Sequence, residues 1–228
     1  MNEWDLWREW LYPLGFLSML IFMARFIFQW LSSEREGRCL VTPLFWNLSI
    51  IGNGLLFIHA LIQNQPHVAC VQSVQAVFAA RNLNLMREES CRWSFRLVLL
   101  LLVTTLSVTA ALFSLQHLFL GVSEWISVPK MPWNSSTVNV SLAWHLFGTV
   151  GIVLFFMRFF VQWVQAEWSL ESRLTAPFWW LSFLGSLISL IYFVRLGDLV
   201  NFIGPIFGLV PYVRNLLLIR REALVHEA

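Results

Sequence analysis

Charged residues, cysteines and catalytic motifs are scarce in this chain. Only 12% of its 228 residues are Asp, Glu, Lys or Arg, whereas ordinary soluble domains carry about 25%. The low charge and the 58% hydrophobic composition exclude a disordered chain, a nucleic-acid-binding domain and a conventional soluble enzyme. We therefore predict an all-α integral membrane protein that crosses the bilayer several times.

The sequence also lacks the spacings that hold metals or perform catalysis. Cys39, Cys70 and Cys91 form no Cys-x-x-Cys or Cys/His pattern, which argues against a disulfide framework and a zinc site. The five histidines form no i, i+4 pair with one another, and the sequence has no glycine-rich phosphate loop. We expect no catalytic residues, no cofactor and no metal, although a membrane-embedded enzyme stays an open alternative.

Seven segments are apolar enough to be membrane spans, which need about 20 mainly apolar residues each. The third segment is the weakest of them, because four polar residues interrupt it. The predicted spans are Leu11–Leu31, Leu44–Ile62, Val68–Leu85, Leu97–Val122, Leu142–Val164, Phe178–Val194 and Leu199–Ile219.

The basic residues are divided unequally between the two sides of these spans. Of the 15 Lys and Arg residues, only Arg8, Lys130 and Arg195 lie on the side of the N-terminus. Cytoplasmic loops carry an excess of Lys and Arg, so we predict an outer N-terminus and a cytoplasmic C-terminus. The first ten residues are more acidic than basic, which is untypical of a cleavable signal peptide.

The chain contains an internal repeat. Sliding it by 133 residues aligns Phe22–Met86 (the first repeat) with Phe155–Ile219 (the second repeat), and 18 of the 65 aligned positions are identical. The identical positions include polar residues, which chance composition explains poorly. They are Phe22/Phe155, Arg25/Arg158, Phe26/Phe159, Gln29/Gln162, Trp30/Trp163, Glu34/Glu167, Thr42/Thr175, Phe45/Phe178, Trp46/Trp179, Leu48/Leu181, Ser49/Ser182, Gly52/Gly185, Ile58/Ile191, Val77/Val210, Arg81/Arg214, Asn82/Asn215, Leu83/Leu216 and Leu85/Leu218.

Each repeat covers three predicted spans, an odd number, so two repeats joined directly would be inverted in the membrane. The additional span between them restores the orientation and gives a 3+1+3 arrangement of parallel repeats, as in SWEET transporters. The predicted domains are an N-terminal three-helix repeat (1–96), a linker transmembrane helix (97–122), an outer loop (123–141) and a C-terminal three-helix repeat with a cytoplasmic tail (142–228).

Repeated Arg, Gln and Asn residues are the candidate site. Arg25 and Arg158 fall about 9 Å inside the cytoplasmic ends of their helices. A guanidinium binds phosphate or carboxylate bidentately, which favours an anionic head group as the ligand. Two alternatives stay open: structural pairing with Glu34 and Glu167, or plain anchoring at the surface. The candidate residues are Arg25, Gln29, Arg81, Asn82, Arg158, Gln162, Arg214 and Asn215.

Two repeated tryptophans complete the candidate set. Trp46 and Trp179 each precede a Ser and a Gly at helical spacing, a pattern typical of close helix packing in lipid. The functional alternative is that each indole stacks on a sugar ring in a central cavity.

The motifs of both repeats carry a resemblance to a known family. The first repeat reads Arg25-Phe-Ile-Phe-Gln29-Trp30, then Glu34, Phe45-Trp46 and Arg81-Asn82-Leu83, and the second repeat has the numbered residues of these motifs 133 positions later. The second repeat differs at two positions inside the first of these motifs and reads Arg158-Phe-Phe-Val-Gln162-Trp163. Together the motifs resemble the lipid-A-disaccharide synthase N-terminal-domain family. The resemblance implies a membrane domain related to the SWEET/PQ-loop fold, in a bacterial inner membrane, without the glycosyltransferase itself.

These observations lead to one hypothesis and two alternatives. We expect a protein of lipid A or glycolipid biosynthesis that binds membrane lipids or a lipid-linked sugar phosphate, and whether it also translocates the lipid stays open. The first alternative is a non-catalytic anchor that docks a cytosolic glycosyltransferase through the basic loop Arg87–Arg96. The second is a SWEET-like carrier of small sugars.

Overall fold

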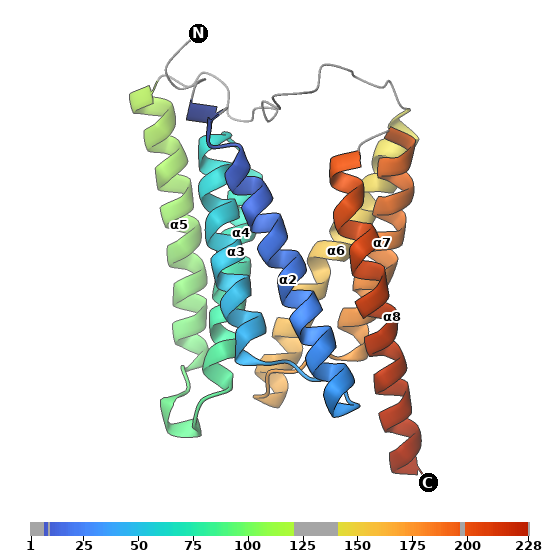
Figure 1. The fold of residues 1–228 in the computed structure, drawn as a ribbon. Coiled ribbons are helices and arrows are strands. Elements are labelled where there is room, and N and C mark those ends of the chain that lie inside the picture. Colours follow the sequence, from blue (N-terminus) through green and yellow to red (C-terminus); the bar gives the residue numbers. More distant parts are fainter. Residues whose placement is uncertain (1–6, 9, 121–140, 197–198, 228) are drawn as a thin grey trace. The chain divides into compact units, whose positions relative to one another are not determined.

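A computed structural model describes residues 7–8, 10–120, 141–196 and 199–227, and these residues form helices and no strands (Figure 1). Each of the seven predicted spans corresponds to a helix. Most of the predicted outer loop, 123–141, lies outside the described residues. The elements are α2 (Pro13–Glu36), α3 (Pro43–Ile62), α4 (Pro66–Leu85), the short 3₁₀ helix η1 (Glu89–Cys91), α5 (Phe95–Leu120), α6 (Leu142–Ser169), α7 (Ala176–Leu196) and α8 (Leu199–Glu227).

Five helices of the described chain are long and apolar enough to cross a membrane: α2, α3, α5, α6 and α7. The helices α4 and α8 fall outside this group, and α4 carries the polar residues that weaken the third predicted span. The all-helical membrane architecture is therefore supported, while the parallel 3+1+3 arrangement stays a prediction.

Proline and left-handed residues set several helix ends. The first residue of α2, α3 and α4 is a proline, whose fixed φ suits the first turn and whose missing N–H has no helical acceptor there. Past the last residue of α2, Gly37 has a φ of 65°, the usual left-handed helix stop. At the matching position after α6, Leu170 has a φ of 53°, which is costly for a residue with a Cβ.

The described residues group into two compact units. The first unit takes its residues from 1–22 and 46–135, and the second unit from 23–45 and 136–228. The boundary therefore falls within α2 and near the start of α3. The second unit contains the end of α2 together with α6, α7 and α8.

Within the first unit, α4 packs against α5. The hydroxyls of Ser73 and Thr109 lie 2.8 Å apart, and Gln116 Nε2 donates to the Leu61 carbonyl at 3.1 Å. Hydrogen bonds between helices satisfy polar groups that lipid cannot solvate. They stabilise this unit alongside the apolar contacts of Phe113.

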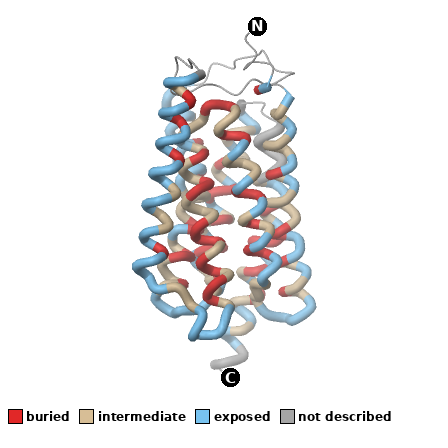
Figure 2. Tube along the Cα trace, turned by 90° about the vertical axis from the view of Figure 1, so that its left-hand side faces the viewer, coloured by how far each residue is buried: buried red, intermediate tan, exposed pale blue. Residues whose placement is uncertain are grey.

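Within the second unit, α7 packs against both α6 and α8. The approach to α6 is close, because a Cβ added at Gly185 would lie 2.8 Å from the Phe155 backbone nitrogen. In Figure 2, buried positions recur along the helices with exposed positions between them. On α6 the buried set is Gly148, Gly151, Arg158, Phe159, Gln162, Trp163 and Ala166.

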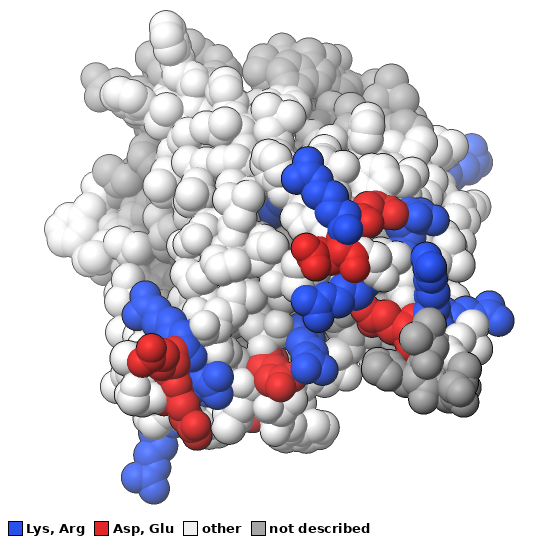
Figure 3. Space-filling model, turned by 60° about the horizontal axis from the view of Figure 1, so that its bottom comes forward, with Lys and Arg blue, Asp and Glu red and all other residues white. Residues whose placement is uncertain are grey.

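Charged side chains lie around the end of α8. Figure 3 shows this end, with Lys and Arg interspersed among Asp and Glu. The exposed basic residues near the C-terminal ends of α2 and α8, in the second unit, include Arg35, Arg38, Arg220 and Arg221. The predicted orientation places them in the cytoplasm, and that orientation stays a prediction.

Candidate functional site

Two guanidinium groups lie together inside the second unit. Arg25 comes from α2 and Arg158 from α6, and each residue is only 3% exposed. Both guanidinium carbons lie close to the same two rings: 4.9 and 5.2 Å from the centre of Phe26, and 5.0 and 4.8 Å from that of Phe159. The residues of this guanidinium cage are Arg25, Phe26, Phe45, Phe155, Arg158, Phe159, Phe178 and Tyr212.

Arg158 is held by rings and one hydroxyl. Its Nη1 donates to Tyr212 Oη at 3.1 Å, and its guanidinium carbon lies 3.5 Å from the centre of the Phe155 ring. The buried Nε has no hydrogen-bond partner, and Arg158 contacts no carboxylate within the described part of the chain. Cation–π contacts offset part of the cost of burying this charge.

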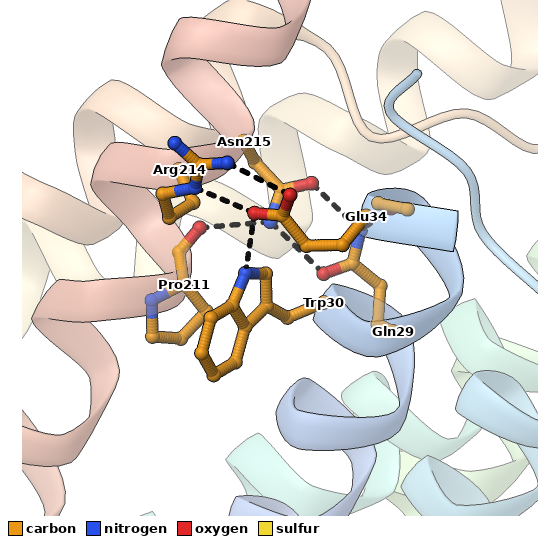
Figure 4. A network of polar contacts seen from close by, with 7 residues as sticks. Gln29, Trp30, Glu34, Pro211, Arg214 and Asn215 are labelled. Atoms are coloured by element: carbon orange, nitrogen blue, oxygen red, sulfur yellow. Dashed lines mark hydrogen bonds and ion pairs between the residues drawn. The ribbon is translucent and has the colours of Figure 1, made fainter. Parts of the chain in front are cut away.

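Two side-chain amides, Gln29 on α2 and Asn215 on α8, lie about one helical turn beyond the cage residues of these helices. Gln29 Nε2 donates to Asn215 Oδ1 at 2.8 Å, and Asn215 Nδ2 donates back to Gln29 Oε1 at 3.1 Å (Figure 4). Both residues are fully buried. Because each amide satisfies the other, the pair fixes the register of α2 against α8.

Glu34 forms an ion pair beside these amides. Arg214 donates to its two oxygens through Nε at 2.5 Å and Nη2 at 2.7 Å, and Trp30 Nε1 donates to Oε1 at 2.9 Å (Figure 4). In the second repeat, Glu167 accepts from Trp163 Nε1 at 3.1 Å. Arg158, the predicted partner of Glu167 in the pairing alternative, donates to Tyr212 Oη.

Three of the predicted site residues lie in the first unit, namely Trp46, Arg81 and Asn82. Arg81 is 2% exposed, and its Nη1 donates to the Trp93 carbonyl at 2.8 Å and to Asn84 Oδ1 at 3.1 Å. This geometry ties the segment after α4 back onto the helix. The other seven lie in the second unit: Arg25, Gln29, Arg158, Gln162, Trp179, Arg214 and Asn215.

Trp179 and Gln162 are buried in the second unit. The indole Nε1 of Trp179 donates to the Leu174 carbonyl at 3.2 Å, and its ring centre lies 5.9 Å from that of Tyr212. Gln162 Nε2 donates to the Arg173 carbonyl at 3.3 Å. Trp179 therefore packs beside a cage residue, and its predicted role as a ligand stays a prediction.

The sequence reasoning missed the aromatic wall of the cage and the environment of Cys39. Phe26 directly follows Arg25, and Phe159 directly follows Arg158, so the repeat itself indicated that each arginine has an aromatic neighbour. Tyr212 has no identical residue in the first repeat and gave no such signal. Cys39 Sγ donates to Asn215 Oδ1 at 3.3 Å, and burial raises the pKa of its thiol to about 11.

Comparison with known proteins supports the repeat. The family described as Lipid A Biosynthesis N-terminal domain matches residues 14–84 and, a second time, residues 147–217. Residue 14 corresponds to 147 and residue 84 to 217, so the predicted register of 133 residues is confirmed.

Similar proteins are named lipid-A-disaccharide synthase. The protein from Chlamydia felis is 36% identical over 217 residues, which are 95% of this chain and 34% of that protein. The protein from Chlamydia trachomatis serovar D is 36% identical over 214 residues, 94% of this chain and 35% of its own. This chain thus spans about a third of the length of these relatives. No solved structure matches it.

Proposed function

Because this chain belongs to the Lipid A Biosynthesis N-terminal domain family, we propose that it is a membrane protein of lipid A or related glycolipid biosynthesis. We propose further that it binds the phosphorylated head group of a glycolipid or a lipid-linked sugar. The family match covers both repeats, and five described helices are suited to a membrane.

The observation that carries this proposal is the guanidinium cage. Burying a cation without a counter-ion is costly, and Arg158 has no carboxylate in contact within the described residues. A phosphate offers several acceptor oxygens to the fork of a guanidinium. A bound head group would neutralise Arg158 and supply an acceptor for its unpartnered Nε.

Other residues of the second unit position the two arginines in this proposal. The amide pair of Gln29 and Asn215 holds α2 against α8, and Gln162 is bound one turn beyond Arg158 on α6. Arg214 is exposed at the same end and would meet an approaching head group first. Arg81, Asn82 and Trp46 belong to the first unit, and their part in binding stays a prediction.

Entry of a head group requires the cage to open, since Arg25 and Arg158 are each 3% exposed. The wall best suited to move is α8, which contains Pro205 and Pro211 in its interior. Each proline removes a backbone hydrogen-bond donor and loosens the helix. Pro211 directly precedes Tyr212, the hydroxyl that binds Arg158.

The topology of the proposed protein follows the charge distribution. We place it in a bacterial inner membrane, with the N-terminus outside, the C-terminus in the cytoplasm and the two repeats parallel about the linker helix. The basic side chains at the end where α8 finishes support this orientation. Translocation of the bound lipid would be a further step of the same proposal.

Lipid extraction from the purified protein tests the binding. We expect mass spectrometry to find a phosphorylated glycolipid that is enriched over the bulk membrane lipids. Arg158→Gln should lose this lipid, whereas Arg173→Gln should retain it, because Arg173 is exposed and pairs with Glu171. Bulk phospholipid alone, unchanged by Arg158→Gln, would contradict the proposal.

A second candidate function is a membrane anchor or partner for a glycosyltransferase. The length of the relatives favours it, since this chain matches only 34% of the Chlamydia felis lipid-A-disaccharide synthase. The basic segment Arg87–Arg96, which contains η1 and is exposed except at the half-buried Arg92 and Trp93, is the proposed docking surface. A photo-crosslinking residue at Arg92 should capture an identified lipid-A-disaccharide synthase in cells. Absence of this product would count against the anchor and leave the lipid proposal intact.

A further inference from the structure

An exposed ion pair joins α2 to α8 within the second unit. Arg214 donates to both carboxylate oxygens of Glu34, through Nε at 2.5 Å and Nη2 at 2.7 Å (Figure 4). Trp30 Nε1 also donates to Glu34 Oε1 at 2.9 Å. Two parallel hydrogen bonds are the geometry in which a guanidinium binds a carboxylate or a phosphate most firmly. We call Glu34 and Arg214 the latch.

The latch lies between the guanidinium cage and the end of α2 and α8 around which charged side chains lie. On α2, Glu34 is nine residues beyond Arg25, a rise of about 14 Å along the helix. The amide pair of Gln29 and Asn215 lies between these two levels and also joins α2 to α8. A head group that enters between α2 and α8 from this end must therefore part the latch first.

The loop after α2 is bonded to the same segment of α8 as the latch. The backbone N–H of Cys39 donates to Glu222 Oε1 at 3.1 Å, and its Sγ donates to Asn215 Oδ1 at 3.3 Å. This segment of α8 follows Pro211, which removes a backbone hydrogen-bond donor from the helix, so the segment can move as one body. The reactivity of the Cys39 thiol therefore reports whether the latch is closed.

Arg214 is accessible to a second anion while it binds Glu34. The side chain of Arg214 is 46% exposed and that of Glu34 is 30% exposed. A carboxylate carries one negative charge, whereas a phosphate monoester carries about 1.5 to 2 at pH 7 and has three acceptor oxygens. Because an exposed ion pair contributes little free energy, a phosphate can compete with Glu34 for the guanidinium.

From this arrangement we infer that the latch closes the cage at the charged end, and that a phosphate head group opens it by taking Arg214 from Glu34. The inference rests on the proposed function, because it supplies the entry step for the same head group. Once Arg214 binds the phosphate, Glu34 no longer joins α2 to α8, and the segment after Pro211 moves away from α2. A passive ion pair would respond to ionic strength alone.

Alkylation of Cys39 in the full chain tests the closure without an added ligand. A Cys70→Ser, Cys91→Ser background leaves Cys39 as the only thiol. In phosphatidylcholine nanodiscs at pH 8, Glu34→Gln should raise the rate of alkylation by N-ethylmaleimide about threefold, because it removes one exposed ion pair. Charge reversal, Glu34→Arg with Arg214→Glu, should restore most of the native rate.

A matched control comes from a second exposed ion pair of the same unit. Glu171 pairs with Arg173 outside the latch, and Glu171→Gln should leave the alkylation rate of Cys39 unchanged. Gel filtration checks that each variant is folded.

A phosphate monoester lipid tests the opening step. Phosphatidic acid at about 5% in the nanodiscs should raise the alkylation rate of the native latch about threefold, as Glu34→Gln does, because both remove the same ion pair. It should have no further effect on Glu34→Gln, whose latch is already open. Oleate at matched negative charge controls for the surface potential and should leave the rate nearly unchanged, because its carboxylate has no advantage over that of Glu34.

The outcomes separate the inference from the proposed function. A rate for Glu34→Gln equal to the native rate, or equal acceleration by phosphatidic acid and oleate, would overturn the inference and leave the proposed function standing. Extraction of bulk phospholipid alone, unchanged by Arg158→Gln, would contradict the proposed function and with it the opening step, even if Glu34→Gln accelerates the alkylation.

Discussion

The two repeats make the same internal hydrogen bonds at corresponding positions, although most of their residues differ. Gln29 donates to the Leu40 carbonyl, and its counterpart Gln162 donates to the carbonyl of Arg173. Each repeat also joins its Trp to the Glu four residues later. Asn82 and Asn215 each donate to the carbonyl four residues earlier. The repeated polar residues therefore define the local geometry of each copy.

Both repeats also have a contact between a tyrosine and a histidine, but the two residue types have exchanged positions. Tyr12 lies edge-on to His59, with ring centres 5.5 Å apart, and at the matching positions His145 lies 2.9 Å from Tyr192 Oη. Gly15 faces His59 and Gly148 faces Tyr192, so a small residue admits each ring. The repeats have thus diverged by exchanging partners across a retained contact.

The last arginines of the repeats show how the copies differ. Arg81 is buried and donates to the backbone of Trp93, whereas its counterpart Arg214 is exposed and forms an ion pair with Glu34. One arginine fixes the segment after its helix, and the other is accessible to a ligand. The same residue type at the same register can therefore serve a structural role in one copy and a surface role in the other.

The largest expected difference is in the alkylation rate of Cys39, which lies in the loop after α2, between the folded and the denatured chain. In a Cys70→Ser, Cys91→Ser background, the raised pKa of Cys39, about 11, leaves roughly a thousandth of it as thiolate at pH 8. Alkylation should be about a hundredfold slower in the folded than in the denatured chain, and the rate should rise tenfold per pH unit up to pH 10. Equal rates in folded and denatured protein would show that this loop is not packed in the second unit.

The paired glycines Gly52 and Gly185 should respond differently to alanine. A Cβ at Gly185 meets backbone atoms of Phe155, whereas one at Gly52 meets the ring of Phe22, which is half-buried and able to turn. We expect Gly185→Ala to lower the free energy of unfolding by about 1–3 kcal/mol, and Gly52→Ala by less. Thermal unfolding in detergent measures both, and the reverse order would contradict the close packing of α6 and α7.

The matched arginines give the next comparison. Arg81→Gln should cost about 1–3 kcal/mol of stability, because it removes donors from buried acceptors at Trp93 and Asn84. Arg214→Gln should leave the melting temperature nearly unchanged, because its ion pair is exposed. A greater loss of stability from Arg214→Gln would reverse the roles assigned to the two repeats.

The helix stops after α2 and α6 should give the smallest effects. Gly37→Leu places a Cβ at a φ of 65° and should cost about 1–2 kcal/mol. Leu170→Gly removes the same strain at a φ of 53°, and greater chain entropy offsets part of the gain, so we expect less than about 1 kcal/mol of stabilisation. Destabilisation by Leu170→Gly would show that its side chain contributes packing.

The helices and the repeat could be predicted from sequence because both leave periodic signals. Runs of apolar residues mark the spans, and matched Arg, Gln and Trp at one offset reveal the duplication. The grouping of Arg25 with Arg158 follows tertiary packing, which periodicity does not encode. For the same reason, the grouping of Arg25 and Gln29, which belong to the first repeat, with the second unit was not foreseeable.

The aromatic residues of the cage show a further limit of prediction from the sequence. Phe26 and Phe159 could be read as neighbours of the arginines, whereas Tyr212 occupies a position that is Ala79 in the first repeat. A residue present in only one copy gives no repeat signal. Its contact with Arg158 depends on how α8 packs within the second unit.

The central claim, that the guanidinium cage binds a phosphorylated head group, is tested most directly by a double-mutant cycle of Arg25 and Arg158 on lipid retention. The measurement is the amount of phosphorylated lipid that remains per chain after extensive washing of the native protein, Arg25→Gln, Arg158→Gln and the double variant. If both arginines bind the same phosphate, each single variant should lose nearly all of the lipid and the double variant should lose no more. Independent, additive losses, or retention by Arg158→Gln equal to that of the native protein, would contradict a shared site.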